Sequence, residues 1–356
     1  MRILIIGGTG FIGREVCRTL ADHDLWVLHR GQTNADLAGV RHIQGDRQAL
    51  GAQRHLLSSI RADVVLDMTS INGGDAKDVI DCLAGLVGRA VVVSSGSVYR
   101  SFGILAGVES AEVIATPSRE DSPLRQRLFP YRHRLLRAED DPWRWFDHYE
   151  KILVERAYLQ QQTLPATIIR LPMVYGPGDP DSRLSFYLRR MLDQRESIVL
   201  HQSGAAWRNS RAFVSNVAQA IATLVLHESP GSVYNVAEPG DWSEADWIRA
   251  LGREVGWTGT VRTLADGVDW RARPSISELP EHSNFAQHLR LDSSCIRDEL
   301  GYAERVTPEE ALRLTVQDLL SRPMPAADYR LDDALLQALE AGGSASPRVR
   351  AMPGRR

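Results

Sequence analysis

The chain has 356 residues, of which 43% are hydrophobic and 24% charged, and its formal net charge at pH 7 is -3. Such a composition is typical of globular proteins, and the length suits one large domain or two of moderate size. A nearly neutral balance gives no reason to expect nucleic acid or an anionic membrane as a partner. No apolar run approaches the ~20 residues that a membrane span requires.

The first predicted strand begins at Arg2, so we expect no signal peptide. Cys17, Cys82 and Cys295 are too far apart to suggest a disulfide framework or a metal site. These observations together predict a cytoplasmic protein. Only two of the 42 basic residues are lysines, Lys77 and Lys151. In so arginine-rich a chain, a lysine indicates a position that needs a compact ammonium of tunable pKa.

A glycine-rich turn follows the first apolar run, Ile3 to Ile6. It reads Gly7-Gly8-Thr9-Gly10-Phe11-Ile12-Gly13 and leads into an amphipathic stretch. Gly7 and Gly10 allow the backbone to turn and approach a pyrophosphate, and Gly13 allows the helix to pack close to the strand. The helix N-terminus favours the phosphate charge. The motif in this context predicts a dinucleotide site.

Short apolar runs alternate with helical patterns in the first half of the chain. The predicted buried strands are Ile3–Ile6, Leu25–Leu28, Val40–Ile43, Val64–Met68, Ala90–Val93 and Ala166–Leu171, with helices such as Asp75–Val87 and Lys151–Gln161 between them. This order predicts an α/β fold, a doubly wound Rossmann parallel sheet with the cofactor at the carboxyl ends of its strands.

The second half has a patchier pattern. We expect helices at Ser182–Arg195, Val214–His227, Ser243–Val255 and Pro308–Leu320, with a short strand at Val233–Val236. The domains expected are therefore a dinucleotide-binding domain at 1–171, with an insert at about 100–147, and a smaller, mostly helical substrate lobe at 172–340, partly interleaved with the first. Residues 341–356, rich in Gly, Ser, Pro and Arg, are expected to be a disordered tail.

Several motifs together resemble the extended short-chain dehydrogenase/reductase family, which includes nucleotide-sugar epimerases and dehydratases. The resemblance covers roughly residues 1 to 321. Besides the glycine turn, it rests on the segments Val93 to Tyr99, Arg170 to Gly178, Arg211 to Ala218 and Tyr234 to Val236. It implies a catalytic serine, tyrosine and lysine: serine positions the substrate oxygen, tyrosine moves the proton, and lysine lowers the tyrosine pKa and holds the nicotinamide ribose.

Two members of this set have clear counterparts, Ser95 and Lys151, and Glu155 occupies the acidic position expected after the lysine. The tyrosine should stand four residues before the lysine, where the chain has Asp147. Tyr149, two residues before Lys151, would point to another side of a regular helix.

Several interpretations of this departure remain open. Asp147 with Glu150 fits a helix capping box, or Asp147 pairs with Lys151 across one turn. In another interpretation, Asp147 or His148 is the general acid/base. Alternatively, an irregular helix start brings Tyr149 into the site, and we favour this last interpretation because the family chemistry uses a phenol. Ser95, Tyr149 and Lys151 are therefore the predicted catalytic residues.

The second strand ends in His29-Arg30-Gly31, without the carboxylate that NAD-selective sites place there, so NADP(H) is preferred, with Arg30 on the 2′-phosphate, and NAD(H) remains possible. By resemblance, Asp46 contacts adenine and Thr69 lies along the pyrophosphate and ribose. The predicted cofactor-binding residues are Gly7, Thr9, Gly10, Phe11, Ile12, Gly13, His29, Arg30, Asp46, Thr69 and Lys151.

The insert at 100–147 should overhang the active site. Its arginines and Trp143-Arg144-Trp145 either bind a charged or ring-bearing substrate or form a solvated flap packed on the core. Arg211 aligns with a family arginine that grips nucleotide-sugar phosphates.

The function expected is NADP(H)-dependent hydride transfer at a carbonyl or carbinol carbon of a small-molecule or nucleotide-sugar-like substrate. The alternatives are an NAD(P)-dependent sugar-nucleotide epimerase or dehydratase and a non-catalytic dinucleotide-sensing or RNA-binding protein, the RNA role being disfavoured by the acidic balance. A homodimer is what the resemblance implies.

Overall fold

The structure is a computed structural model. It describes residues 1–31, 37–132, 136–229, 231–269, 271–276, 279–324 and 326–341. The predicted tail lies outside the described residues from position 342 onward. Within the described ranges, no helix is both long and apolar enough to cross a membrane.

A seven-stranded, all-parallel sheet forms the centre of one half of the molecule. Its strands are β1 (Arg2–Ile6), β2 (Asp24–His29), β3 (Val40–Gln44), β4 (Val64–Asp67), β5 (Arg89–Ser95), β6 (Ala166–Leu171) and β10 (Val233–Asn235). The order across the sheet is β10-β6-β5-β4-β1-β2-β3. The strand order reverses between β1 and β4, which is where a doubly wound sheet opens a crevice for a ligand. The predicted fold class is confirmed.

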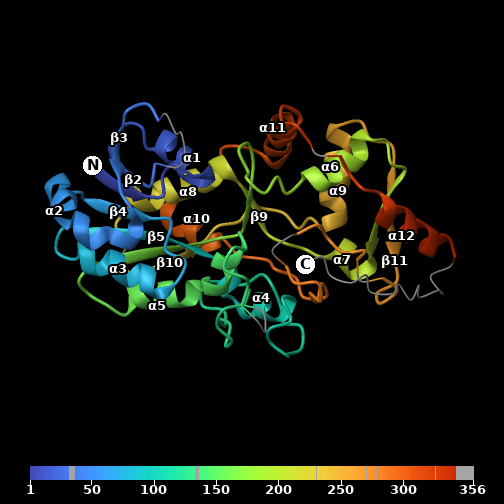
Figure 1. The fold of residues 1–356 in the computed structure, drawn as a ribbon, viewed down its shortest axis with the longest axis horizontal. Helices are drawn as coiled ribbons and strands as arrows, with labels where there is room; N and C mark the ends of the chain where they lie inside the picture. Colours follow the sequence, from blue (N-terminus) through green and yellow to red (C-terminus); the bar gives the residue numbers. More distant parts are fainter. Residues whose placement is uncertain are drawn as a thin grey trace.

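Helices cover both faces of this sheet, because its strands are apolar on both sides. One face packs against α2 (Leu50–Ile60), α3 (Gly73–Leu83) and α5 (Lys151–Leu159), and the other against α1 (Phe11–Thr19) and α8 (Val214–Leu226). Figure 1 shows the sheet between these layers.

A smaller lobe forms the other end of the molecule (Figure 1). It contains α6 (Ser185–Leu192), α7 (Gln202–Ala206), α9 (Glu244–Glu254) and α12 (Arg330–Glu340), and the parallel pair β8 (Ser197–His201) and β11 (Thr260–Leu264). A second parallel pair, β7 (Met173–Tyr175) and β9 (Arg211–Phe213), lies at the junction between the two halves. The helix α11 (Pro308–Leu320) packs against α9 and belongs to the hydrophobic core that also contains residues of α1 and α8.

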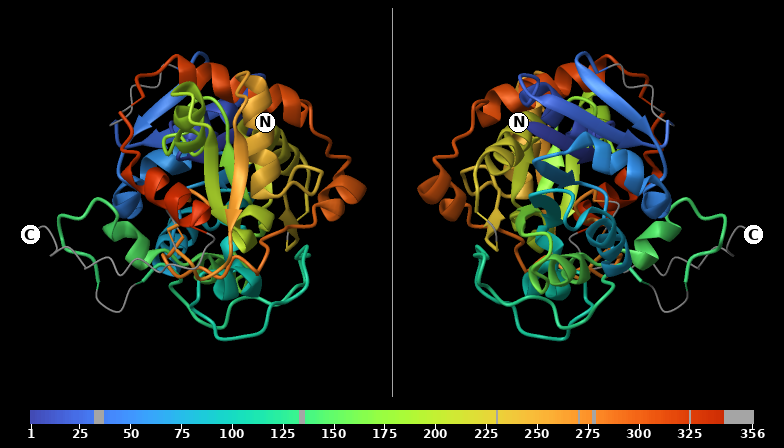
Figure 2. Two further views of the ribbon diagram at one scale, coloured as in Figure 1. Left: turned by 90° about the vertical axis from the view of Figure 1, so that its right-hand side faces the viewer. Right: turned by 90° about the vertical axis from the view of Figure 1, so that its left-hand side faces the viewer.

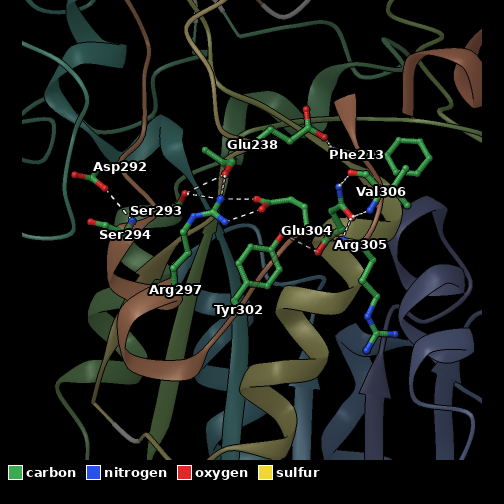
Figure 3. A network of polar contacts seen from close by, with 12 residues as sticks. Phe213, Glu238, Asp292, Ser293, Ser294, Arg297, Tyr302, Glu304, Arg305 and Val306 are labelled. Atoms are coloured by element: carbon green, nitrogen blue, oxygen red, sulfur yellow. Dashed lines mark hydrogen bonds and ion pairs between the residues drawn. The ribbon is translucent and has the colours of Figure 1, made fainter. Parts of the chain in front are cut away.

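The chain returns from the lobe to the sheet before ending. The strand expected near Val233 stands between helices of the second half along the chain, and in the structure it is β10, which pairs with β6 and forms the edge of the central sheet. The helix α10 (Ser294–Leu300) then packs beside β10. The segment that follows α10 is held by a polar network (Figure 3).

Arg297 is the centre of that network. Its Nη1 donates to Glu304 Oε2 at 2.6 Å, and its Nη2 donates to the carbonyl oxygen of Ala237 at 2.9 Å. On the other side, the amide of Asn216 in α8 exchanges hydrogen bonds with the backbone of Val306. Side chains of α8 and α10 therefore fasten residues 301–306 to the sheet half of the molecule.

The segment between β5 and α5 leaves the sheet. It begins with the 3₁₀ helix η2 (Gly96–Val98) and α4 (Arg100–Leu105), and it ends with the 3₁₀ helix η3 (Arg144–His148). Both views in Figure 2 show the middle of this segment as a loop along the lower edge of the molecule. Phe102 and Leu105 of α4 form a small separate core with Trp207 and Phe285 of the lobe.

Candidate active site

A cavity of about 360 Å³ opens at the carboxyl ends of β1, β2 and β4, at the point where the strand order reverses. Seven of the predicted cofactor-binding residues line it: Gly7, Thr9, Gly10, His29, Arg30, Asp46 and Thr69. The remaining glycine-turn residues, Phe11, Ile12 and Gly13, form the first turn of α1 beside the cavity. The structure therefore brings the predicted dinucleotide site together.

The glycine turn depends on positions that have no side chain. Gly7 has φ of +100°, which side chains rarely adopt. A Cβ at Gly13 would lie 2.7 Å from Gly8 Cα, so only glycine allows α1 to approach the loop this closely. No side chain caps the N-terminus of α1, which begins after Gly10. The hydroxyl oxygen of Thr69 is buried against the cavity with no hydrogen-bond partner in the described structure. These features fit a bound dinucleotide.

The far end of the cavity is formed by His29 and Arg30. His29 Nδ1 accepts a hydrogen bond from the backbone of Gly31 at 3.0 Å, and its Nε2 lies 2.9 Å from Nδ1 of His42. Because Nδ1 is an acceptor, His29 carries its proton on Nε2 and donates to His42. Desolvation and the neighbouring His42 lower the pKa of His29, which favours this neutral form. Arg30 is exposed at the rim.

Ser95, Tyr149 and Lys151 converge at the carboxyl end of β5. Ser95 is the last residue of β5, Lys151 is the first residue of α5, and Tyr149 stands in extended conformation between η3 and α5. Lys151 Nζ lies 5.8 Å from the centre of the Tyr149 ring. The helix start is thus irregular, and the phenol lies near both groups although it is two residues from Lys151 rather than four.

Lys151 is buried in front of two backbone carbonyls. Its Nζ donates to the carbonyl oxygen of Ser70 at 2.6 Å and to that of Val93 at 2.8 Å. Burial lowers the pKa of Lys151 to about 8, and the nearby carboxylates of Asp67 and Glu155 oppose this shift. The ammonium is held between β4 and β5.

Tyr149 faces two hydroxyl groups. Burial raises its pKa, and the hydroxyls of Ser95 and Ser97 offset part of that shift. Ser97 Oγ is buried and makes no hydrogen bond of regular geometry in the described structure. Its backbone N–H donates to Ser95 Oγ at 3.1 Å. The phenol is therefore protonated near neutral pH and lies against a hydroxyl pair. The sequence analysis missed Ser97, although its place two residues after Ser95 was the available signal.

Asp147 is neither the N-cap of α5 nor part of the helix that begins at Lys151. The N-cap of α5 is Glu150, whose carboxylate accepts from the backbone of Ile152 at 2.9 Å, so the capping-box prediction is wrong. Asp147 is buried within η3, where its carboxylate accepts from Arg137 through both backbone and side chain. Because Asp147 and Lys151 do not belong to one continuous α-helix, the basis for a pair across one helical turn is removed. His148, also in η3, is exposed.

Glu155 belongs to a buried network next to the site. Its carboxylate accepts from Ser94 Oγ at 2.6 Å and forms a bidentate pair with Arg170. Arg170 in turn donates to the hydroxyl of Tyr99 at 2.8 Å, and Tyr99 donates to Asn235 on β10 at 2.7 Å. This chain of contacts ties α5 to β5, β6 and β10 and so fixes the strand end that carries Ser95.

A second cavity, of about 160 Å³, opens beside Ser95 on the side of the lobe. Its apolar lining comes from α4, the insert, β6 to β7 and the lobe: Phe102, Tyr131, Leu171, Pro172, Met173, Trp207, Ile276, Leu279, Leu289 and Leu291. Ser95, Ser97, Arg183, Asn209 and Ser210 provide its polar groups. A largely apolar cavity with a few convergent polar groups beside the candidate catalytic serine is the expected form of a substrate site.

Arg211 lies in an adjoining cavity that shares Asn209 and Ser210 with this apolar cavity. Its guanidinium is buried, pairs with Glu244 at 2.5 Å and lies 4.4 Å from the centre of the Trp247 ring. Its Nε and Nη1 have no hydrogen-bond partner in the described structure. Sequence reasoning missed the carboxylate partner Glu244.

Phe102 and Tyr131 of the insert line the apolar cavity, and several arginines of the insert bind protein groups. Arg125 pairs with Glu150, and Arg132 donates to the carbonyl oxygen of Asp147 at 2.9 Å. The aromatic residues form a cluster around Phe146, in which Trp145 stacks at 3.9 Å and Tyr131 lies 4.9 Å away between ring centres. Trp143 and Trp145 remain about half exposed. The insert is thus partly a packed flap, and its Tyr131 lines the apolar cavity.

Comparison with known proteins identifies the class to which this fold and site belong. The model of the NAD dependent epimerase/dehydratase family matches residues 3–103 and 148–237, and it passes over most of the insert. The chain therefore belongs to this family of NAD-dependent enzymes.

Individual relatives are distant. The dTDP-D-glucose 4,6-dehydratase of Mus musculus is 21% identical over 344 residues, 89% of this chain and 88% of that protein. The 2'-dehydrokanamycin reductase of Streptomyces kanamyceticus is 38% identical over 98 residues, 27% of this chain and 28% of the reductase. The structure of dTDP-glucose 4,6-dehydratase from Bacillus anthracis in complex with NAD has a TM-score of 0.63 at 16% identity and covers 90% of this chain and 97% of that one. These likenesses support the fold.

Proposed function

We propose that this protein transfers hydride between a nicotinamide dinucleotide and a carbonyl or carbinol carbon of a small-molecule substrate, with Ser95, Tyr149 and Lys151 as its catalytic residues. The observation that carries the proposal is their convergence at the end of β5, where Ser95 also lines the apolar cavity. A fold alone does not define a reaction, whereas this placement of groups does restrict it.

Each residue has a distinct role in the proposal. Ser95 orients the substrate oxygen, and Tyr149 moves a proton to or from it. Lys151 holds the nicotinamide ribose, and its charge favours loss of the phenol proton. The dinucleotide, when bound, supplies or accepts the hydride. Because burial raises the pKa of Tyr149, the phenol is protonated at neutral pH, and this state suits proton donation during carbonyl reduction.

NADP(H) is the preferred cofactor in this proposal. Strand β2 ends without a carboxylate, and Arg30, which lines the rim of the cavity, is the cation that would hold a 2′-phosphate. We expect Arg30→Ala to weaken NADPH binding about tenfold and to leave NADH binding within twofold, since one charge-assisted contact is worth about 1.5–3 kcal/mol. The change is measured by cofactor fluorescence. Equal losses for both cofactors would contradict the role of Arg30.

A second candidate is an epimerase or dehydratase acting on a nucleotide-linked sugar. Two nitrogens of Arg211 that have no partner in the described structure favour it, because a buried guanidinium with available donors suits a phosphate. Such an enzyme would regenerate its cofactor in each turnover, whereas a reductase would consume NADPH.

One experiment separates these possibilities. The purified protein is analysed for retained nucleotide, emptied, and titrated with NADPH and NADH, and it is then assayed with dTDP-glucose and with a panel of ketones and keto sugars. Retained oxidised cofactor and conversion of dTDP-glucose support the second candidate, and freely exchanging NADPH that is consumed with a ketone supports the first. Ser95→Ala should lose turnover and still bind cofactor. Failure to bind either dinucleotide, or full turnover by Ser95→Ala, would overturn the proposal.

A further inference from the structure

Helix α5 begins at Lys151 because Glu150 caps it. The backbone of Glu150 is extended, with φ of -153° and ψ of 91°, and its N–H donates to the carbonyl oxygen of Ile71 at 2.7 Å. Glu150 Oε1 accepts from the N–H of Ile152, one of the first unpaired donors of the helix. Residues 147 to 149 are therefore excluded from α5, and Tyr149 projects from an extended segment.

Glutamate is not a favoured N-cap residue, so something else must hold Glu150 in this position. Two groups of the insert hold it: the backbone N–H of Phe129, which donates to Glu150 Oε2 at 2.5 Å, and the guanidinium of Arg125. Its Nη2 and Nη1 lie 3.0 and 3.3 Å from Oε1 and Oε2 of Glu150, and both side chains are fully buried. The geometry is bidentate, which fixes the direction of the carboxylate as well as its position.

Arg125 also holds the serine side of the site. Its Nε donates to the carbonyl oxygen of Ser97 at 2.5 Å, and its backbone N–H donates to the carbonyl oxygen of Val98 at 2.8 Å. One guanidinium thus connects η2, which follows Ser95, to the residue between Tyr149 and Lys151. Tyr149 also lies beside aromatic rings, with Tyr131 at 5.4 Å, Trp145 at 6.1 Å and Phe146 at 6.4 Å between ring centres.

We propose that Arg125 and Glu150 are positioning residues: their buried ion pair sets the start of α5 and holds Tyr149 against Ser95, in place of the helical turn that would otherwise connect a tyrosine to the lysine. The inference rests on the proposed function for the role of Tyr149, but the positioning itself is a structural claim about that side chain. The insert is then a structural part of the active site as well as its cover.

The test follows Tyr149 directly. The full chain is produced with 3-fluorotyrosine and examined by fluorine NMR, with the Tyr149 signal identified by its absence in Tyr149→Phe. The double variant Arg125→Met with Glu150→Gln removes both charges at once, and the glutamine side chain keeps an oxygen for the N–H of Ile152. Removing both partners of a buried pair avoids leaving one buried charge unpaired. We expect the Tyr149 signal to move towards that of an exposed tyrosine and the other signals to stay in place.

Two further variants make the result decisive. Arg125→Lys retains the charge but loses the bidentate geometry, so it should move the Tyr149 signal by a smaller amount and serves if the double variant folds poorly. Arg190→Met with Asp332→Asn removes another bidentate pair, a partly buried one that joins α6 to α12 in the lobe, and should leave the signal unchanged. An unmoved Tyr149 signal in the folded double variant, or in Arg125→Lys where the double variant does not fold, would overturn the positioning role.

Turnover provides the readout that links position to chemistry. On a substrate converted in the assay described above, kcat should fall on the order of 100-fold in the double variant, with the affinity for NADPH unchanged within threefold. Adding Tyr149→Phe should then cost little more, because the phenol is already misplaced. Full activity of Tyr149→Phe in the otherwise unchanged protein would contradict the proposed function, and the NMR result would still decide the positioning claim.

Discussion

Burial moves the pKa values of Tyr149 and Lys151 in opposite directions, so both groups favour their neutral forms more than they do in water. The effect is larger than the opposing effect of Asp67 and Glu155 on Lys151, whose pKa lies at about 8. The ammonium is therefore the group in the site that titrates first above neutral pH.

A chain with two lysines allows this to be measured without a substrate. In protein labelled with lysine carrying carbon-13 at the ε position, the Lys151 signal should titrate with a midpoint near pH 8. Lys77 is an internal control, because its pair with Asp81 raises its pKa above the ordinary 10.5. Lys151→Arg assigns the signals. Two signals that both titrate above pH 10 would contradict the buried, partly desolvated ammonium.

Glu238, at the junction of sheet and lobe, is another group with a perturbed pKa. Burial raises its pKa from 4.5 to about 7, although it accepts from the backbone of Phe213 at 2.7 Å. Because its pKa is raised in the folded state, the stability from this group is fully present below about pH 4.5 and is lost as the pH rises through 7.

Glu238→Gln should remove that loss, since the amide oxygen still accepts from Phe213. We expect the variant to have an unfolding free energy about 2 kcal/mol above that of the unchanged protein at pH 8, with a smaller difference at pH 5. Urea unfolding at the two pH values measures it. An equal difference at both would show that the carboxylate does not titrate in this range.

Single residues were predicted from the sequence where a local motif determines them. The glycine turn, Ser95 and Lys151 are of this kind, because strand end and helix start place them within a few residues. Tyr149 was harder, since its position depends on where α5 begins. That start is set by Arg125, which is distant in sequence, so a pattern over residues 147 to 151 alone allowed several outcomes.

At the scale of elements, the close contact between α1 and the glycine loop has a direct energetic consequence. A methyl group at Gly13 would meet the backbone of Gly7 and Gly8, so α1 or the loop must move. We expect Gly13→Ala to weaken binding of NADPH at least about tenfold, which corresponds to ~1.4 kcal/mol. Titration with NADPH measures the loss.

Gly51 in α2 provides the matched control. It is also a glycine near a helix start, but nothing lies within 4 Å of the position its Cβ would take. Gly51→Ala should therefore leave NADPH affinity unchanged and stabilise the protein by up to ~1 kcal/mol. Equal losses of affinity in both variants would mean that the effect does not come from the contact at Gly13.

The strands of the first half were predicted almost at their observed bounds, because parallel strands buried on both faces form short apolar runs between turns. For β10 the element was predicted but its neighbour was not. A strand of three residues gives no sequence signal for the strand with which it pairs. Val233 to Asn235 pair with β6, which lies more than sixty residues earlier in the chain. The strand beside which β10 pairs depends on long-range packing, and the hydrophobic periodicity of a short segment does not predict such packing.

At the scale of the whole molecule, the segment after α10 joins the sheet half through the pair of Arg297 with Glu304. Both side chains are mostly shielded, and the guanidinium also donates to Ala237 and Ser293. We expect Glu304→Gln to lower the unfolding free energy by about 1.5–3 kcal/mol, as for a charge-assisted hydrogen bond.

The control is the exposed pair of Glu310 with Arg313 on α11, where Glu310→Gln should cost no more than ~0.5 kcal/mol. Thermal and urea unfolding of both variants gives the comparison. If the two substitutions cost the same, the network drawn in Figure 3 does not contribute to stability beyond an ordinary surface pair.

The late arrival of β10 also has a consequence during synthesis. Until residue 235 has left the ribosome, β6 is an unpaired edge strand of the sheet in the nascent chain. Ile168, Ile169 and Arg170 then lack the neighbouring strand that β10 later provides. An exposed apolar strand edge is a template for pairing with other chains. A polypeptide interrupted between residues 171 and 233 would carry that edge permanently, so translational pausing or truncation in this interval should favour aggregation and recruitment of chaperones.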